Sequence, residues 1–117
     1  MMGFCTGCRS WYVVTVFAVL YRWRVKPGTD AAFRDAWRSA TESIRMRYGT
    51  GGSRLHRTDE GEFMAYAVWP SRDTWVEARK LPSANPEAGA KMRDCIEESF
   101  PSVMLDVLDD LLGPAPR

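Results

Sequence analysis

The chain has 117 residues, which suits a single domain, and its hydrophobic fraction of 45% is enough to build a buried core. Charged residues make up 26% of the chain, which excludes a disordered protein. The 16 basic and 15 acidic residues leave a net charge of +1, so neither nucleic acid nor a membrane surface is an expected partner.

Three cysteines, Cys5, Cys8 and Cys95, are too few for a disulfide framework, so we expect a reduced protein in the cytoplasm. The apolar run 11–20 is too short to cross a bilayer as a helix, and it continues directly into residues typical of a strand. The Cys5-x-x-Cys8 pair offers two of the roughly four ligands that zinc needs. Two such pairs meeting in a dimer would supply four, but we predict no metal site.

The order of helical and strand patterns predicts a chain of alternating elements. Strands are indicated by β-branched and aromatic residues, and helices by apolar residues at helical spacing. Thr29 or Asp30, Ser71 and Asn85 are suited to cap helices, and Gly49 is suited to end one. The predicted elements are strand 13–25, helix 30–48, strands 53–58 and 62–69, a short helix 72–80, a helix from Pro86 that reaches Ser99, and a last strand 103–112. Within that last segment, residues 109–112 also suit a helical turn.

This order, β-α-β-β-α-β with the second helical region broken in two, is the ferredoxin-like pattern of the α+β class. Its helices cover one face of an antiparallel sheet. We predict one such domain over residues 13–112, preceded by a tail over residues 1–12 and followed by a tail over residues 113–117.

Two of the predicted strands carry apolar residues on a second face. If that face lies away from the helices, the exposed patch is too large for a monomer. Packing two sheets face to face about a two-fold axis would cover it and form a dimeric α/β barrel, so a homodimer through the sheet face is predicted. The alternative is that some of these residues face the helices. The residues concerned are Val16, Ala18 and Leu20, and Met64, Tyr66 and Val68.

Three stretches of the chain carry a resemblance to a known family. They are 19–28 before an amphipathic helix, 52–57, and 65–75, a strand that ends in Trp69 before a second aromatic residue, Trp75. They resemble antibiotic-biosynthesis monooxygenase domains, and the similarity extends over about residues 14–112. The resemblance implies a dimeric α/β barrel. The family includes cofactor-free oxygenases, haem-degrading enzymes and members without a known reaction, so it implies no single activity.

In this family the ligand cavity lies between the sheet and the helices of each subunit. The resemblance implies that helix-facing aromatic residues and alanines line it, which suits a planar, largely apolar substrate. Ordinary core packing is the alternative for each of them. The predicted pocket residues are Phe63, Ala65, Ala67, Trp69, Trp23, Trp37 and Trp75, with Tyr66 as a further candidate and Phe33 and Tyr21 beside them.

His56, the single histidine, is the predicted catalytic base, and Arg54 is its predicted charge partner. A cofactor-free oxygenase must deprotonate a phenolic or enolic substrate so that the carbanion can reduce dioxygen, and a base with a pKa near neutrality helps. An arginine could hold the resulting oxyanion. Strand alternation puts both side chains on one face, and either face could meet the cavity. Tyr21 and Tyr66 are alternative proton-transfer groups.

The haem-degrading branch of the family uses an Asn on the first strand and a haem-ligating His on the later helix. The position of the Asn is Tyr21 here, the helix position falls near Ala90, and no His follows Arg57. Without an axial ligand of that kind, haem degradation is not expected, and we predict no cofactor.

These observations predict a cofactor-independent monooxygenase that acts on a small aromatic or polyketide-like compound. A non-catalytic small-molecule-binding or accessory protein is one alternative. An isomerase or decarboxylase on the same barrel is another.

Overall fold

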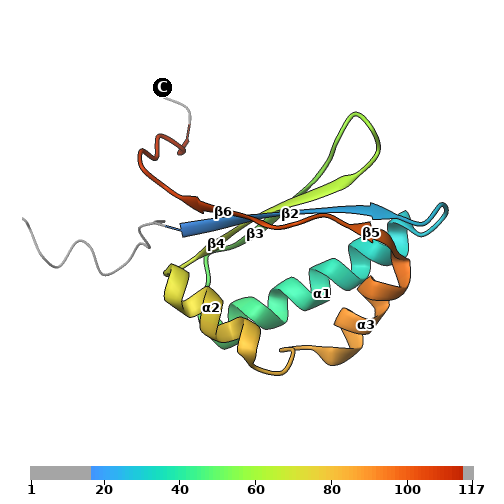
Figure 1. The fold of residues 1–117 in the computed structure, drawn as a ribbon, viewed down its shortest axis with the longest axis horizontal. Helices are drawn as coiled ribbons and strands as arrows, with labels where there is room; N and C mark the ends of the chain where they lie inside the picture. The colour runs from blue at the N-terminus through green and yellow to red at the C-terminus, as the bar shows by residue number, and fades with distance from the viewer. Residues whose placement is uncertain (1–16, 115–117) are drawn as a thin grey trace, which may run out of the picture.

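The computed structural model describes residues 17–114, in which one sheet is covered on a single face by three helices (Figure 1). The predicted domain 13–112 begins outside these residues, so its boundaries stay a prediction. None of the described helices is long and apolar enough to cross a membrane. The elements are β2 (Phe17–Val25), α1 (Asp30–Tyr48), β3 (Gly52–Arg57), β4 (Phe63–Trp69), α2 (Arg72–Lys80), α3 (Pro86–Cys95), β5 (Ile96–Ser99) and β6 (Val103–Asp106).

The sheet is antiparallel, with the strand order β3-β4-β2-β5, and β6 pairs with β2 as well. β5 and β6 follow one another along the same edge of β2, because β4 occupies its other edge from Phe17 to Trp23. Between them, the backbone N–H of Phe100 donates to the carbonyl of Arg22 at 3.0 Å. This arrangement confirms the predicted ferredoxin-like order.

Two predicted boundaries were wrong, both near the C-terminus. α3 ends at Cys95 instead of reaching Ser99, and Ile96 is already extended, with φ −84° and ψ 125°. The free edge of β2 pairs with residues 96–99 and thereby overrides the local helical pattern. The last strand ends at Asp106, and residues 107–112 have no regular structure. The exposed acidic pair in this segment favours solvent over a sheet edge.

Local signals place the end of α1 and the starts of α2 and α3 where they were predicted. α1 ends at Gly49, which adopts a left-handed φ of 63° that glycine tolerates best. The Ser71 hydroxyl accepts the N–H of Thr74 at 3.0 Å at the start of α2. The Asn85 side chain accepts the N–H of Ala88 at 3.1 Å at the start of α3, where proline occupies the first turn.

The two faces of the sheet differ in burial, and β4 shows this most clearly. Its residues alternate strictly between buried and half-buried. The buried set faces the helices, and we call this side the inner face. The half-buried set lies on the opposite side, the outer face, where no helix packs (Figure 1). The inner set is Phe63, Ala65, Ala67 and Trp69, and the outer set is Met64, Tyr66 and Val68. Val68, next to the end of the strand, also borders the cavity between α1 and the sheet.

The residues between the helices and the inner face form two separate hydrophobic clusters. The first consists of Phe17, Val19, Ala67, Trp69 and Trp75. The second consists of Phe33, Phe63 and Cys95, with the two phenyl rings stacked at a centroid distance of 5.0 Å. Because the clusters are separate, the layer beneath α1 is not filled continuously.

Candidate functional site

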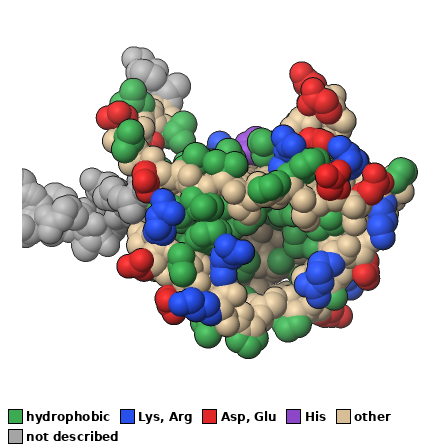
Figure 2. Space-filling view, in the orientation of Figure 1, with side chains coloured by type: hydrophobic (Ala, Val, Ile, Leu, Met, Phe, Trp, Pro, Cys, Tyr) green, Lys and Arg blue, Asp and Glu red, His purple; other side chains and the backbone are tan. Residues whose placement is uncertain are grey.

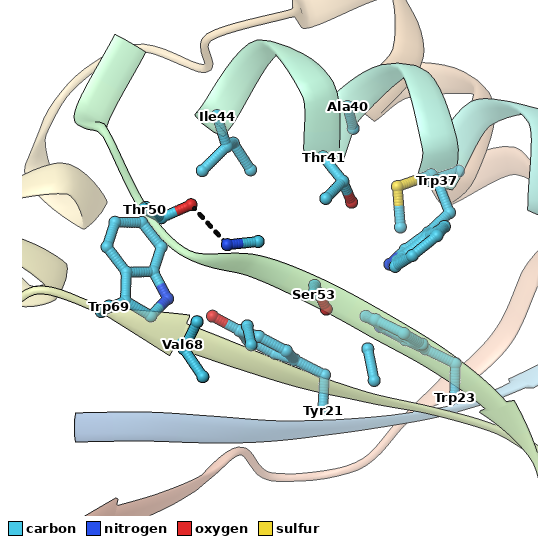
Figure 3. Close-up of a pocket in the computed structure, with 14 residues that line it drawn as sticks. Tyr21, Trp23, Trp37, Ala40, Thr41, Ile44, Thr50, Ser53, Val68 and Trp69 are labelled. Carbon is cyan, nitrogen blue, oxygen red and sulfur yellow. Dashed lines mark hydrogen bonds between the residues drawn. The ribbon is translucent and has the colours of Figure 1, made fainter. Parts of the chain in front are cut away.

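A cavity of about 240 Å³ lies between α1 and the inner face of the sheet. Figure 2 shows the molecule hollowed between the sheet and the helices, with hydrophobic side chains in the hollow. The close-up in Figure 3 shows side chains of α1 on one side and side chains of the strands on the other. The lining residues that matter below are Tyr21, Trp23, Trp37, Ala40, Thr41, Ile44, Ser53, Ala65, Ala67 and Trp69.

Small residues create the cavity. Ala65 and Ala67 occupy successive inner positions of β4, and Ala40 faces them from α1. Larger side chains at these positions would fill the space between sheet and helix, as Phe63 does one step further along β4. The cavity therefore results from the small side chains of the strand and does not depend on the conformation of a loop.

Two parallel aromatic rings form a flat wall of the cavity. Tyr21 and Trp23 are successive inner residues of β2, with their ring centroids 5.8 Å apart and their planes 5° from parallel. In Figure 3, Trp69 stands at one end of this wall and Trp37 at the other. Such a surface suits a planar ligand, because flat rings stack on it with large contact area.

The Tyr21 hydroxyl is the most constrained polar group of the cavity. Its oxygen accepts the indole N–H of Trp75 at 3.0 Å, and the indole nitrogen of Trp69 faces the same oxygen (Figure 3). Burial raises the pKa of Tyr21, while the indoles of Trp75 and Trp69 and the charge of Arg79 oppose that rise. Tyr21 is therefore protonated at neutral pH, and its O–H can donate to a ligand.

Two buried polar atoms of the cavity lack a hydrogen-bond partner among residues 17–114. They are Ser53 Oγ and Trp69 Nε1, the latter facing Tyr21 without reaching hydrogen-bond geometry. Leaving a buried polar group unpaired costs about 1–3 kcal/mol, so such groups are uncommon away from binding sites. Both are positioned to bond a polar atom of a molecule in the cavity.

The lining carries no carboxylate, imidazole, ammonium or guanidinium group among the described residues. Among the lining residues Tyr21 has the only titratable side chain, and burial raises its pKa. The cavity therefore offers hydrogen-bond donors that can stabilise a developing negative charge, and it offers no general base of its own.

The structure brings most of the predicted pocket residues together. Trp69, Ala65, Ala67, Trp23, Trp37 and Tyr21 line the cavity. Trp75 does not line it and instead lies behind Tyr21, which it holds through its indole N–H. Phe63 and Phe33 belong to the second hydrophobic cluster and pack against each other.

The other predicted site residues lie on the outer face. In the β3–β4 register Arg54 pairs with Tyr66 and His56 pairs with Met64, all on the side opposite the cavity. His56 is exposed, and its Nδ1 lies 3.1 Å from the carbonyl oxygen of Met64. His56, Arg54 and Tyr66 therefore do not line this cavity, and their catalytic role stays a prediction.

Sequence reasoning missed the small polar residues of the lining. Ser53 and Thr41 carry no motif, and their importance follows from position alone. The signal available for Ser53 was strand alternation: it shares a face with Leu55, which packs against the second hydrophobic cluster and so marks the inner face of β3.

The cysteines divide between described and undescribed parts of the chain. Cys5 and Cys8 lie outside the described residues. Cys95 is a buried free thiol that packs with Phe33 and Phe63. Within residues 17–114, no three His, Cys, Asp or Glu side chains are grouped in a way that could hold a metal ion.

Comparison with known proteins gives the fold a context. Rv0793 from Mycobacterium tuberculosis superposes with a TM-score of 0.65 at 21% identity, covering 82% of this chain and 98% of that protein. SnoaB from Streptomyces nogalater, described as a cofactor-independent oxygenase, gives a TM-score of 0.69 at 17% identity, with coverages of 84% and 98%. A conserved protein from Methanosarcina mazei gives 0.65 at 14% identity, with coverages of 79% and 92%.

These similarities to solved structures show the fold alone, because each identity is low. No protein of curated function matches the chain significantly. The sequence profile of the family described as antibiotic biosynthesis monooxygenase matches residues 16–85, which is more than half of the chain and includes β2, α1, β3, β4 and α2. The chain therefore belongs to the antibiotic biosynthesis monooxygenase family.

Proposed function

We propose that the protein is a cofactor-independent monooxygenase whose cavity binds a small, planar, hydroxylated aromatic compound. The observation that carries the proposal is the convergence of the Tyr21 hydroxyl and the Trp69 indole N–H at one end of an uncharged, aromatic-walled cavity. Family membership supports it, as does the fold shared with SnoaB, which is described as a cofactor-independent oxygenase.

In the proposed reaction the substrate binds as its phenolate or enolate. The O–H of Tyr21 and the N–H of Trp69 donate to the oxyanion, which increases the fraction of substrate that is ionised. A ring carbon of the resulting carbanion transfers electrons to dioxygen and forms a C–O bond. One oxygen atom stays on that carbon as a carbonyl. The other leaves as water with two hydrogens of the substrate, the proton lost on ionisation and the hydrogen still on that carbon.

The proposal assigns no base within the cavity, because the lining contains none among the described residues. It therefore requires a substrate acidic enough to lose its proton to water once its anion is stabilised. His56 and Arg54 lie on the outer face and have no part in this step. Trp75 is a positioning residue that fixes the Tyr21 hydroxyl.

Oxygen consumption with a hydroxylated anthrone or naphthol tests the proposal. Wild-type protein should consume oxygen with no added cofactor, and the product should carry a new carbonyl oxygen derived from labelled dioxygen. Trp69→Phe keeps a large ring but removes the donor, and it should lower kcat by about 10²-fold. Tyr48→Phe is the matched control, because Tyr48 packs on the Trp69 ring but does not line the cavity. Its kcat should be unchanged.

A non-catalytic binding protein is the second candidate, and the lack of a base in the lining favours it. In that case the aromatic ligand binds with no oxygen uptake above the rate measured without protein. An isomerase or decarboxylase would instead convert its substrate under anaerobic conditions, which separates these reactions from oxygenation.

The proposed active form is a homodimer joined through the outer face, in the cytoplasm. Leu20 and Tyr66 are half-buried there and pair across β2 and β4, next to Val103 of β6, which is 50% exposed. A second copy of the same face would cover this apolar surface.

Light scattering after size exclusion tests the dimer. The wild-type chain of 13.3 kDa should elute with about twice its mass, and Tyr66→Arg should elute as a monomer. Met46→Arg is the matched control, because Met46 is 87% exposed on α1, in the helical layer. A monomeric wild-type protein would contradict the proposal.

A further inference from the structure

We propose that a basic groove beside the cavity binds the carboxylate of an aromatic acid whose ring lies in the cavity. The inference rests on the proposed function and deepens it, since it names the substrate class as a hydroxylated aromatic acid. Neither the family match nor the likeness to solved structures assigns a role to this groove.

The groove has a volume of about 320 Å³ and lies between α1 and the end of β3. Its polar lining consists of Arg34 and Arg38 from α1 and of His56 and Arg57 from β3. Its apolar lining consists of Trp37, Leu55 and Phe63. A surface that combines guanidinium groups with aromatic side chains is suited to a ligand that has both an anionic group and a flat ring.

The strand register makes the groove a continuation of the cavity. Leu55 pairs with Ala65, which lines the cavity, and the next inner pair along the same strands is Arg57 with Phe63, which lines the groove. Leu55 lies between the two spaces. Moving along β3 and β4 in this direction therefore leads from the uncharged cavity to the basic groove.

Trp37 stands where the two spaces meet. It lines both the cavity and the groove, and it occupies the end of the cavity opposite Trp69 (Figure 3). Arg34 and Arg38 lie three residues before and one residue after it on α1. A ligand stacked on the wall of Tyr21 and Trp23 would reach the arginines by passing this indole.

The arginines of the groove are available to an anionic ligand. Arg57 lies 3.2 Å from Asp30 and Arg38 lies 3.1 Å from Asp35, but both pairs are exposed. Exposed pairs contribute little to stability, so a ligand carboxylate can replace either aspartate at little cost. Arg34 has no acidic partner among residues 17–114. A guanidinium group binds a carboxylate through two parallel hydrogen bonds.

The two ends of the combined space fix the arrangement of groups on the ligand. The hydroxyl belongs at the end with Tyr21 and Trp69, and the carboxylate belongs beyond Trp37 at the other end. The cavity volume of about 240 Å³ is below the range of about 300–1,000 Å³ that drug-sized ligands occupy. One or two fused rings with the hydroxyl and the carboxylate at opposite ends fit these limits.

Isothermal titration calorimetry with three matched probes tests the inference. The probes are 6-hydroxy-2-naphthoate, its neutral carboxamide, and 2-naphthol. The last keeps the hydroxyl but has neither a carboxylate nor a carboxamide. Wild-type protein should bind the acid about tenfold more tightly than the carboxamide. In the double variant Arg34→Gln/Arg38→Gln the acid and the carboxamide should bind equally, within about twofold. Both arginines are exposed, so the variant should fold normally.

Arg93→Gln is the control, because it removes the same charge from α3, away from the groove. It should keep the tenfold preference. Equal binding of acid and carboxamide to wild-type protein, or a preference that survives in the double variant, would overturn the inference. In either case continued binding of 2-naphthol leaves the proposed function intact. If no probe binds, both this inference and the proposed function are wrong. If inorganic phosphate binds as tightly as the acid, the groove takes free anions, and the assignment to an aromatic acid is wrong.

Discussion

The two ends of the layer between α1 and the sheet are built from the same elements but packed differently. At one end Phe33 and Phe63 stack against each other beside Cys95, and both rings are almost fully buried. At the other end Ala65 and Ala67 leave a cavity. Because Phe63 and Ala65 are successive inner residues of β4, the side-chain volume at single positions separates a structural core from a binding site.

The largest expected effect is on stability at the filled end. Phe33 is fully buried, so Phe33→Ala should lower the free energy of unfolding by about 3–5 kcal/mol. Ile44→Ala, which truncates a residue facing the cavity, should cost about 2 kcal/mol or less, because Ile44 already has empty space beside it. Urea denaturation of both variants measures the difference. Equal costs would contradict the contrast between the two ends.

Much of this contrast could be predicted from the sequence, because its signals are local. The 3.6-residue spacing of Phe33 and Trp37 and the two-residue spacing of Phe63 and Ala65 indicate which side chains face inward. Gly49, Ser71 and Asn85 mark the helix ends through the backbone geometry that each prefers. These signals do not depend on where the rest of the chain lies.

Other features depend on contacts between residues distant in sequence, and these could not be predicted. Residues 96–99 form a strand only because the edge of β2 is free to pair with them. The position of His56 depends on which face of β3 meets α1, and Leu55 is the only large apolar residue of that strand that marks it. The hydrogen bond between Tyr21 and Trp75 joins residues 54 positions apart. Tertiary structure decides all three.

Tyr21→Phe should have the second largest effect, at the hollow end. The substitution leaves the buried N–H of Trp75 without its acceptor, which should cost about 1–3 kcal/mol in stability. Ligand binding should weaken as well, because the ligand loses the O–H donor. Tyr48→Phe is the control and should change neither quantity. Denaturation and calorimetric titration of both variants give the comparison, and an unchanged Tyr21→Phe protein would show that the hydroxyl has no structural role.

A third test converts the hollow end into a filled one. Ala67→Leu places a larger side chain in the cavity, so it should weaken binding of a naphthol at least tenfold, or about 1.4 kcal/mol. Stability should change by less than about 1.5 kcal/mol, because the added atoms enter existing space. Ala31→Leu makes the same change on the exposed side of α1 and should leave binding unaffected. Undiminished binding to Ala67→Leu would exclude this cavity as the ligand site.

The smallest expected effect is on alkaline stability, and it again distinguishes the hollow end. Burial raises the pKa of Tyr21 above its ordinary value of 10.0, because the phenolate is poorly solvated there. Below pH 10 the tyrosine is protonated in both states and contributes no pH dependence. Above about pH 10 the unfolded chain releases this proton while the folded chain keeps it, so the free energy of unfolding falls as the pH rises.

Tyr21→Phe lacks this titration, so the stability advantage of the wild-type protein over the variant should shrink as the pH rises past 10. Urea denaturation at several alkaline pH values measures it, and the other titrating groups cancel because both proteins carry them. An advantage that stays constant with pH would mean that Tyr21 ionises as readily in the folded protein as in the unfolded chain. Its hydroxyl would then lie in solvent, and the hollow end would not be the desolvated site that oxyanion stabilisation by Tyr21 requires.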